Sequence, residues 1–246
     1  MIQKDERSKG IIKTILKAMA ITSRDLRDSW EKEISNNNNN GLPAAVWAKR
    51  CESLTNDFNN EEDIDVLHIK RGGLWQIDPV FDTTTGVLYL LFNSDSLYLI
   101  KRKYFKNSIS RHYSVSLLLM NEGLITESNE QLELFPANNE EEQRKFKIEE
   151  INKMLGKNAE NVKSVVIVSA DYYSNTMIEA RLELYTPNFS LVEVYDVTKL
   201  IPNRYNVEEL LGDVEETQLS TLLNVDSLVE KPIVKLRDTV KENNNI

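Results

Sequence analysis

Three aspartates in and around one glycine-containing stretch are the residues that most resemble a metal-dependent catalytic site. Asp78 and Asp82 belong to segment 69–82, IKRGGLWQIDPVFD, and Asp65 precedes it. Metal-dependent nucleases can combine such an aspartate with a carboxylate-x-Lys motif on a following strand, which holds the ion that activates water. The next apolar segments, GVLYLLF and SLYLIKRK, supply lysine without an acidic residue two places before it. A divergent metal-dependent nuclease is therefore one alternative, and no metal ligand is assigned.

The histidines and the cysteine are too few for the common metal and nucleophile sites. The chain has 2 histidines, His68 and His112, and 1 cysteine, Cys51. A single cysteine forms no internal disulfide, and this set argues against a His/Cys zinc site. Phosphate-binding glycine loops, the nucleophile elbow and the usual zinc and calcium motifs are also missing from the sequence. We therefore expect no catalytic residue and no cofactor.

His112 and Cys51 each have a structural interpretation that outweighs the chemical one. Histidine titrates near neutrality, but no Ser, Cys or Asp stands at an interpretable spacing from His112, so we expect it to cap or line a helix start. Cys51 follows Arg50, which would lower the pKa of a nearby thiol. It also falls on the helical stripe of Trp47 and Leu54, which predicts a buried core cysteine.

Segment 101–112 is basic within an acidic chain. The whole chain has a formal net charge of −9 at pH 7, whereas this segment carries five cations and no acid. With Tyr104, Phe105 and Tyr113 close by, such a run can follow phosphates and stack bases, so nucleic-acid binding is a second alternative. The overall charge opposes a polyanion at long range and favours a solvated face. The acidic end of the chain, 207–246, is in turn suited to imitate DNA or to occupy a basic groove of a partner.

Helical periodicity dominates the first sixty residues. Apolar positions recur every three or four residues between 4 and 34, and Thr22 with Ser23 resembles an N-cap, so two helices are predicted to meet near residue 22. Asparagines 36–40, followed by Gly41 and Pro43, predict a loop. Residues 43–58 resume helical spacing, with Pro43 at an acceptable position for a helix start.

Strands and further helices follow. A period of two predicts strands over 64–70, LWQIDPVFD and GVLYLLF, with hairpin turns at Gly72–Gly73 and 83–86, while SLYLIKRK is either a strand or the start of a helix. Two further helices are predicted. One lies within 104–123 and ends near Gly123, and the other covers 140–155. The segments SVVIVSADY, MIEARLELY and FSLVEVYDV predict an antiparallel meander with turns at Ser174–Asn175 and Pro187–Asn188. The inner positions expected for the 140–155 helix are Phe146, Ile148, Ile151 and Leu155.

These patterns predict an α+β fold. It consists of N-terminal helices, a central antiparallel β region, further helices and a second antiparallel meander, with the two β regions either separate or joined in one sheet. The predicted parts are N-terminal helices in 1–35, an α/β-hairpin core in 44–125, a connection in 126–142, a helix with the meander in 143–205, and an acidic helix with a frayed tail in 206–246.

The order of these segments resembles a family of uncharacterised bacterial proteins, mainly from Firmicutes, defined as a domain of unknown function. The similarity is carried by KRGGLWQIDPVFDTTTGVLYLLF, RHYSVSLLLMNEGL, VVIVSADY and LELYTPNFSLVEVYDVTKLI, over about residues 45–201. Gly73 and the long tail depart from the family pattern. The resemblance implies an α+β fold and no assigned activity. The matching positions are Arg71, Gly72, Trp75, Leu88, Tyr89, His112, Tyr113 and Asn121.

The expected function is binding. No stretch of the chain approaches the run of about 18 apolar residues that a membrane span needs. The start of the chain lacks the apolar core of a signal peptide. We therefore expect a cytoplasmic protein without membrane contact. We expect a non-catalytic protein-binding accessory or regulatory protein of a bacterial host, prophage or defence or counter-defence system. Trp30, Trp47 and Trp75 are mainly core candidates, and an exposed one would be the first interface candidate. The candidate binding residues are Arg71, Trp75, Lys101, Arg102, Lys103, Lys106, Arg111, His112 and Tyr113.

Overall fold

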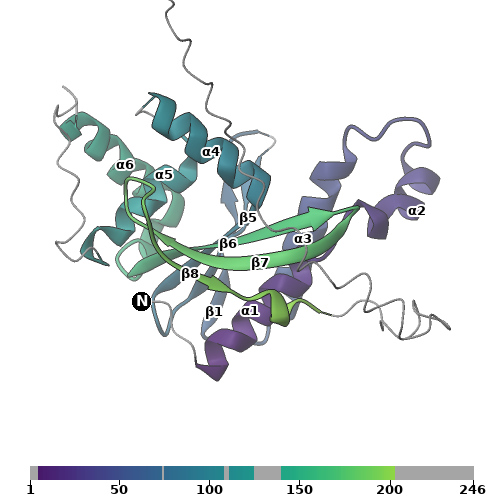
Figure 1. Cartoon of the computed structure of the whole chain (residues 1–246), viewed down its shortest axis with the longest axis horizontal. Helices are drawn as coiled ribbons and strands as arrows, with labels where there is room; N and C mark the ends of the chain where they lie inside the picture. The colour runs from purple at the N-terminus through teal and green to yellow at the C-terminus, as the bar shows by residue number, and fades with distance from the viewer. Residues whose placement is uncertain (1–4, 74, 108–110, 125–139, 203–246) are drawn as a thin grey trace, which may run out of the picture. The chain divides into compact units, whose positions relative to one another are not determined.

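The computed structural model describes residues 5–73, 75–107, 111–124 and 140–202. Helices and strands are intermixed along the chain, which confirms the α+β prediction (Figure 1). The helices are α1 (Glu6–Met19), α2 (Ser23–Glu33), α3 (Leu42–Phe58), α4 (Ser94–Asn107), α5 (Tyr113–Leu117) and α6 (Glu140–Leu155), with 3-10 helices η1 (Leu118–Leu124), η3 (Gly156–Asn158) and η4 (Thr198–Leu200). The strands are β1 (Ile64–Val66), β2 (Ile69–Lys70), β3 (Gln76–Ile77), β4 (Val80–Asp82), β5 (Val87–Asn93), β6 (Ser164–Tyr173), β7 (Thr176–Tyr185) and β8 (Leu191–Asp196).

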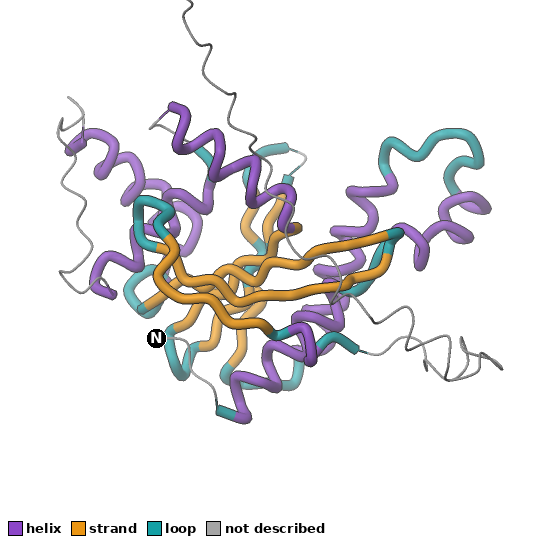
Figure 2. Tube along the Cα trace, in the orientation of Figure 1, coloured by secondary structure: helices purple, strands orange, loops and turns teal. Residues whose placement is uncertain are grey.

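The two predicted β regions join in one six-stranded sheet of order β1-β4-β5-β6-β7-β8 (Figure 2). Strands β5 and β6 pair in parallel, with Leu88 opposite Val165 and Phe92 opposite Ser169. Every other neighbouring pair in this sheet is antiparallel. Parallel neighbours need a long crossover, and here it contains α4, α5, η1 and α6. Strands β2 and β3 form a separate hairpin.

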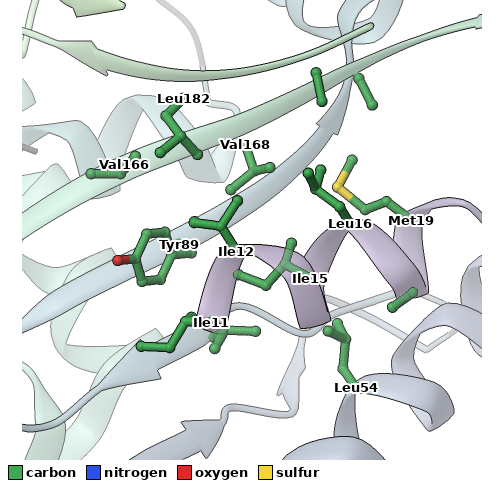
Figure 3. Close-up of a cluster of buried hydrophobic side chains, with 14 of the residues drawn as sticks. Ile11, Ile12, Ile15, Leu16, Met19, Leu54, Tyr89, Val166, Val168 and Leu182 are labelled. Carbon is green, nitrogen blue, oxygen red and sulfur yellow. The ribbon is translucent and has the colours of Figure 1, made fainter. Parts of the chain in front are cut away.

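One face of the sheet packs against α1 and α3. The apolar stripe of α1 points toward strand residues such as Tyr89, Val166 and Leu182, and Leu54 of α3 reaches the same cluster (Figure 3). This burial explains why the N-terminal period is so regular, since an amphipathic helix is held mainly by its apolar face. The buried apolar residues of α1 are Ile11, Ile12, Ile15, Leu16, Ala18 and Met19.

The opposite face packs against the crossover helices. Leu97 of α4, Val115 of α5 and Ile151 of α6 share a buried cluster with Leu88 and Ile167 of the sheet. These helices lie together on the side of the sheet away from α1 (Figure 1). The sheet is therefore the middle layer of three, with a separate apolar core on each face.

Asn121 of η1 bridges the ends of two strands. Its Nδ2 donates to the carbonyl oxygens of Val165 at 2.9 Å and Tyr185 at 2.8 Å, and its Oδ1 accepts from the Val165 amide at 2.7 Å. The side chain is buried, so these bonds satisfy backbone groups that no neighbouring strand pairs. Asn121 thus ties the crossover to β6 and β7.

Several local predictions are confirmed. Thr22 and Asp25 form a capping box at the start of α2. The Ser174–Asn175 turn has positive φ at both residues, 48° and 62°, as a two-residue hairpin loop requires. The turn before β5 needs Gly86, which has φ of +79°, and a Cβ there would lie 2.8 Å from the Asn161 carbonyl oxygen.

Other predictions are wrong in detail. The single strand expected over 64–70 is divided into β1 and β2, and LWQIDPVFD is divided at Pro79, which cannot donate a ladder hydrogen bond. For SLYLIKRK, predicted as either a strand or the start of a helix, the helical alternative is correct, since the segment lies within α4. Phe146 and Ile148 are exposed rather than inner positions of α6, whereas Ile151 and Leu155 are buried as expected.

Some predictions lie outside the described residues. These are most of the 126–142 connection and the acidic helix with its tail in 206–246. Across the part of the chain that the structure describes, no helix combines the length and apolarity needed to cross a membrane.

Candidate functional site

A cavity of about 580 Å³ lies where α3, the β2–β3 hairpin, the end of β5, the start of α4 and the start of α5 meet. We call it the aromatic pocket. It adjoins the carboxyl end of β5, the strand that pairs in parallel with β6, and ligands commonly bind at such strand ends. Its aromatic lining consists of Trp47, Trp75, Phe92, His112 and Tyr113, and its polar lining includes Cys51, His68, Gln76, Asp78, Asn93 and Ser96.

Asp78 is the centre of the polar lining. Its side chain is only 3% exposed. Its Oδ1 lies 2.5 Å from His68 Nδ1 and 2.6 Å from Gln76 Nε2, and its Oδ2 accepts from the Cys51 thiol at 2.8 Å. A buried carboxylate requires such partners because it has lost its water. The group therefore holds the hairpin and α3 in place around the cavity.

The backbone explains how these side chains meet. The β2–β3 hairpin pairs Ile69 with Ile77 and Lys70 with Gln76, so the next pair outward in the same register is His68 with Asp78. Gly72 permits the turn with φ of +145°. On α3, Trp47 and Cys51 are four residues apart and lie on the same side of the helix.

The pKa values of Cys51 and His112 are both shifted in the direction that favours the neutral form. Burial, followed by the hydrogen bond and negative charge of Asp78, raises the pKa of the Cys51 thiol well above its usual range. Burial, followed by the positive charges of Arg71 and Lys103, lowers the pKa of His112 to about 4. Neither group is thus prepared as a thiolate or an imidazolium near pH 7.

His112 caps α5, as the sequence predicted. Its Nδ1 accepts from the Ser114 amide, so the neutral ring carries its proton on Nε2. The ring also contacts Tyr113 at a centroid distance of 4.4 Å, and Tyr113 stacks on Phe92 at 5.8 Å. These contacts form one wall of the aromatic pocket.

Arg71 and Trp75, two of the candidate binding residues, differ in their surroundings. Arg71 packs against α6, where its guanidinium donates to Glu150 at 2.6 Å. Trp75 is 56% exposed, so the expectation that it is a core residue is wrong, and it lines the aromatic pocket. Trp30 and Trp47 are half-buried, and the Trp30 indole donates to the Asn38 carbonyl.

The cations of segment 101–112 do not all point the same way. Lys101 turns inward, where its ammonium lies 3.1 Å from the Tyr185 hydroxyl and 4.5 Å from the centre of its ring. Arg102, Lys103 and Lys106 are exposed on α4, and Arg111 is exposed before α5. The five candidate cations therefore do not share one face.

α4 carries exposed apolar side chains beside its exposed cations. Tyr98 is 62% and Phe105 is 59% exposed, and Leu99 is also exposed. At helical spacing these residues and the cations cover one continuous side of α4, opposite the packed Leu97, Ile100 and Tyr104. We call this side the α4 outer face, and it consists of Tyr98, Leu99, Arg102, Phe105 and Lys106, with Lys103 at its border toward the aromatic pocket.

The three aspartates of the nuclease alternative lie apart. Asp82 is fully buried and accepts from Arg7 at 3.1 Å, whereas Asp65 is exposed. Extending the register in which Val80 pairs with Tyr89 places Leu91 opposite Asp78. A metal site at Asp78 would need a second carboxylate at that position, and leucine supplies none. Across the described residues no group of three His, Cys, Asp or Glu side chains is placed to hold a metal ion.

The polar cluster around Asp78 was not predicted as a unit. From the sequence, Asp78 is interpreted only as a metal ligand, and His68 is considered only in the histidine count. Cys51 is weighed as a reactive thiol beside Arg50 and favoured as a buried core cysteine, whereas in the structure it is only partly buried and lines the cavity. The hairpin prediction contained part of the signal: a turn centred on Gly72–Gly73 would place His68 opposite Ile77, and the observed register, centred one half-step later on Gly73, places His68 opposite Asp78. The contribution of Cys51 depends on how α3 packs, which no local pattern in the sequence encodes.

The model of a family of unknown function, DUF5986, matches residues 4–246. The chain belongs to this family. The predicted resemblance to an uncharacterised family is therefore confirmed, and the match extends over both ends of the chain. Searches of curated proteins and of solved structures returned no match.

The residues that match the family pattern fall into two groups in the structure. Leu88, Tyr89 and Asn121 are buried and hold the sheet and the crossover together. Trp75, His112 and Tyr113 line the aromatic pocket, and Arg71 is close enough to His112 to influence its pKa.

Proposed function

We propose that this DUF5986 protein is a non-catalytic accessory or regulatory protein that binds a partner protein through the α4 outer face. The observation that carries the proposal is the exposure of Tyr98, Leu99 and Phe105 on a helix whose opposite side is already packed. Exposed large apolar side chains that lie together mark interaction sites more often than chance exposure does.

The partner that best fits this face is an acidic segment with apolar side chains. Arg102 and Lys106 lie one helical turn apart among the apolar residues, so they would face carboxylates while Tyr98 and Phe105 enter apolar pockets. Tyr, Phe and Arg are enriched at protein interfaces. An aromatic side chain that becomes fully buried there often dominates the binding energy.

Nucleic acid fits the same face less well. Lys101 is withdrawn toward Tyr185, and the chain as a whole has a net charge of −9. Leu99 offers apolar area but no ring on which a base can stack. Binding of nucleic acid is therefore an outcome that the experiment below must separate from protein binding.

We place this function in the cytoplasm of a bacterium. The single cysteine supports a reducing compartment, and the asparagine-rich composition supports an AT-rich bacterial genome. A role in the host, in a prophage or in a defence or counter-defence system remains part of the proposal.

The test compares partner recovery by four forms of the full chain from the source organism, with and without phage infection. They are the unchanged protein, Tyr98→Ala/Phe105→Ala, Arg102→Glu/Lys106→Glu, and Phe146→Ala as control, because Phe146 is also an exposed Phe on a helix. We expect one acidic protein to be retained by the first and last forms only. A partner retained by all four forms, or a nuclease-sensitive association, would contradict the proposal.

A further inference from the structure

We propose that the aromatic pocket binds a nucleobase or nucleoside, meaning an uncharged planar heterocycle that carries an amino group. This site is separate from the α4 outer face, although Ser96 and Ile100 of α4 line the cavity. The volume of about 580 Å³ lies in the range of small-molecule sites.

The pocket walls suit a planar ring. Trp75 enters from the hairpin, Trp47 from α3, and the stacked pair of Tyr113 and Phe92 from α5 and β5. Trp75 is more than half exposed, so a ligand ring that stacks on it would remove a large apolar surface from water. Stacking of a base on an aromatic side chain is worth about 1–3 kcal/mol.

The polar lining selects ligands that donate hydrogen bonds. A carboxylate only accepts, so the bond from Gln76 Nε2 to Asp78 turns the Gln76 Oε1 acceptor away from Asp78. No described residue donates to that Oε1. His68 is likewise fixed by its Nδ1 contact with Asp78, which leaves its Nε2 on the other side of the ring. The ligand edge would therefore present N–H groups, as the amino-bearing bases do.

The charges near the cavity argue against phosphate recognition. Among the described residues that line it, Arg50 is the one cation, and Asp78 and Glu52 are anionic. Arg50 is already engaged, because its Nε donates to the Ile21 carbonyl at 2.8 Å and its guanidinium lies over the rings of Trp47 and Tyr172. Arg71 and Lys103 lie close enough to lower the pKa of His112 but do not line the cavity. Within the described lining an added phosphate would thus meet only a cation that is already engaged.

The test is calorimetric titration of the full chain with adenosine, guanosine, cytidine and uridine, and with the 5′-monophosphate of whichever nucleoside binds most tightly. We expect at least one of the three amino-bearing nucleosides to bind in a 1:1 ratio and more tightly than uridine. We expect its monophosphate to bind no more tightly than the nucleoside.

Two substitutions of exposed residues link the binding to the pocket. Trp75→Ala should weaken binding about tenfold, and Gln76→Ala should weaken it about threefold, since each removes one contact. Tyr173→Ala is the control, because Tyr173 is an exposed aromatic residue beside the β6–β7 turn, and it should leave binding unchanged. Circular dichroism establishes that each variant is folded.

Three results would overturn the proposal. They are the absence of binding by all four nucleosides at millimolar concentration, binding that both pocket variants leave unchanged, and a monophosphate that binds more than about tenfold tighter than its nucleoside. The α4 outer face is intact in both pocket variants, so failure here leaves the proposed protein partner untouched.

Discussion

His68 and Asp78 face each other across the open end of the β2–β3 hairpin, with 2.5 Å between His68 Nδ1 and Asp78 Oδ1. The carboxylate also accepts from the Cys51 thiol, so one buried charge links the hairpin to α3. This relationship makes the electrostatics of the aromatic pocket accessible to experiment through the thiol.

Replacing Asp78 by Asn should lower the pKa of Cys51. Burial is the largest cause of the raised thiol pKa and would persist, but the negative charge of Asp78 would be gone, so the pKa should fall and still exceed its usual value. The pH profile of alkylation by iodoacetamide reports this pKa. Its midpoint should move to lower pH in Asp78→Asn and stay in place in Tyr173→Ala, whose residue is exposed beside the β6–β7 turn. An unmoved midpoint in Asp78→Asn would refute the assignment.

His112 should make the protein less stable in acid. Its pKa is about 4 in the folded chain against 6.5 as the reference for the unfolded chain, so between these values the unfolded state binds more protons. The stabilisation is complete above about pH 6.5, falls as the pH is lowered toward 4, and totals about 3 kcal/mol. Urea denaturation at pH 7, 5.5 and 4.5 measures it.

His112→Asn is the matched variant, because Asn is also a good N-cap and does not titrate in this range. The pH dependence of its unfolding free energy should be smaller than that of the unchanged protein by the His112 contribution. Equal pH dependence in both proteins would show that His112 titrates normally.

How much of this molecule the sequence predicts depends on how local each determinant is. The N-cap at Thr22, the Ser174–Asn175 turn and the period of α1 are local, and they were predicted correctly. The parallel pairing of Leu88 with Val165 joins segments more than seventy residues apart, so no window contains it.

Where the sequence left alternatives open or predicted wrongly, the deciding contacts are tertiary rather than local. The apolar run in SLYLIKRK fits a strand as well as a helix, so the sequence leaves both alternatives open. The exposed positions of Tyr98 and Leu99 depend on what α4 packs against. Phe146 has the spacing of an inner residue, yet α6 buries the side that carries Ile151 and Leu155. For the pocket, the His68–Asp78 pair follows from the hairpin register, whereas Cys51 joins it only through tertiary packing.

Asn121→Ala should destabilise the protein by about 3 kcal/mol. The substitution removes three hydrogen bonds and leaves buried backbone groups of Val165 and Tyr185 without a partner. Asn188→Ala is the control, because Asn188 is exposed and its contact with the Tyr104 hydroxyl is long, at 3.4 Å. Guanidinium denaturation should separate the two variants, and similar unfolding free energies would argue against the bridging role.

Replacing glycine by alanine should change the stability of the protein in opposite directions at two positions. Gly86→Ala should cost about 2 kcal/mol, since its φ is +79° and the new Cβ would meet the Asn161 carbonyl oxygen. Gly10→Ala should stabilise by about 1 kcal/mol, because Gly10 lies within α1 with nothing near its Cβ position. Thermal unfolding midpoints should therefore move down for the first and up for the second, and shifts of the same sign would contradict this account.

The most direct test of binding through the α4 outer face is photo-crosslinking of the full chain in cells of the source organism. A benzoylphenylalanine placed at position 105 should form a covalent adduct with one acidic protein, and the same probe at position 146 should not. The adduct should disappear when Arg102→Glu/Lys106→Glu is combined with the probe at 105. Adducts with nucleic acid, or the same protein adducts from both positions, would contradict the claim that this face recognises a specific partner protein.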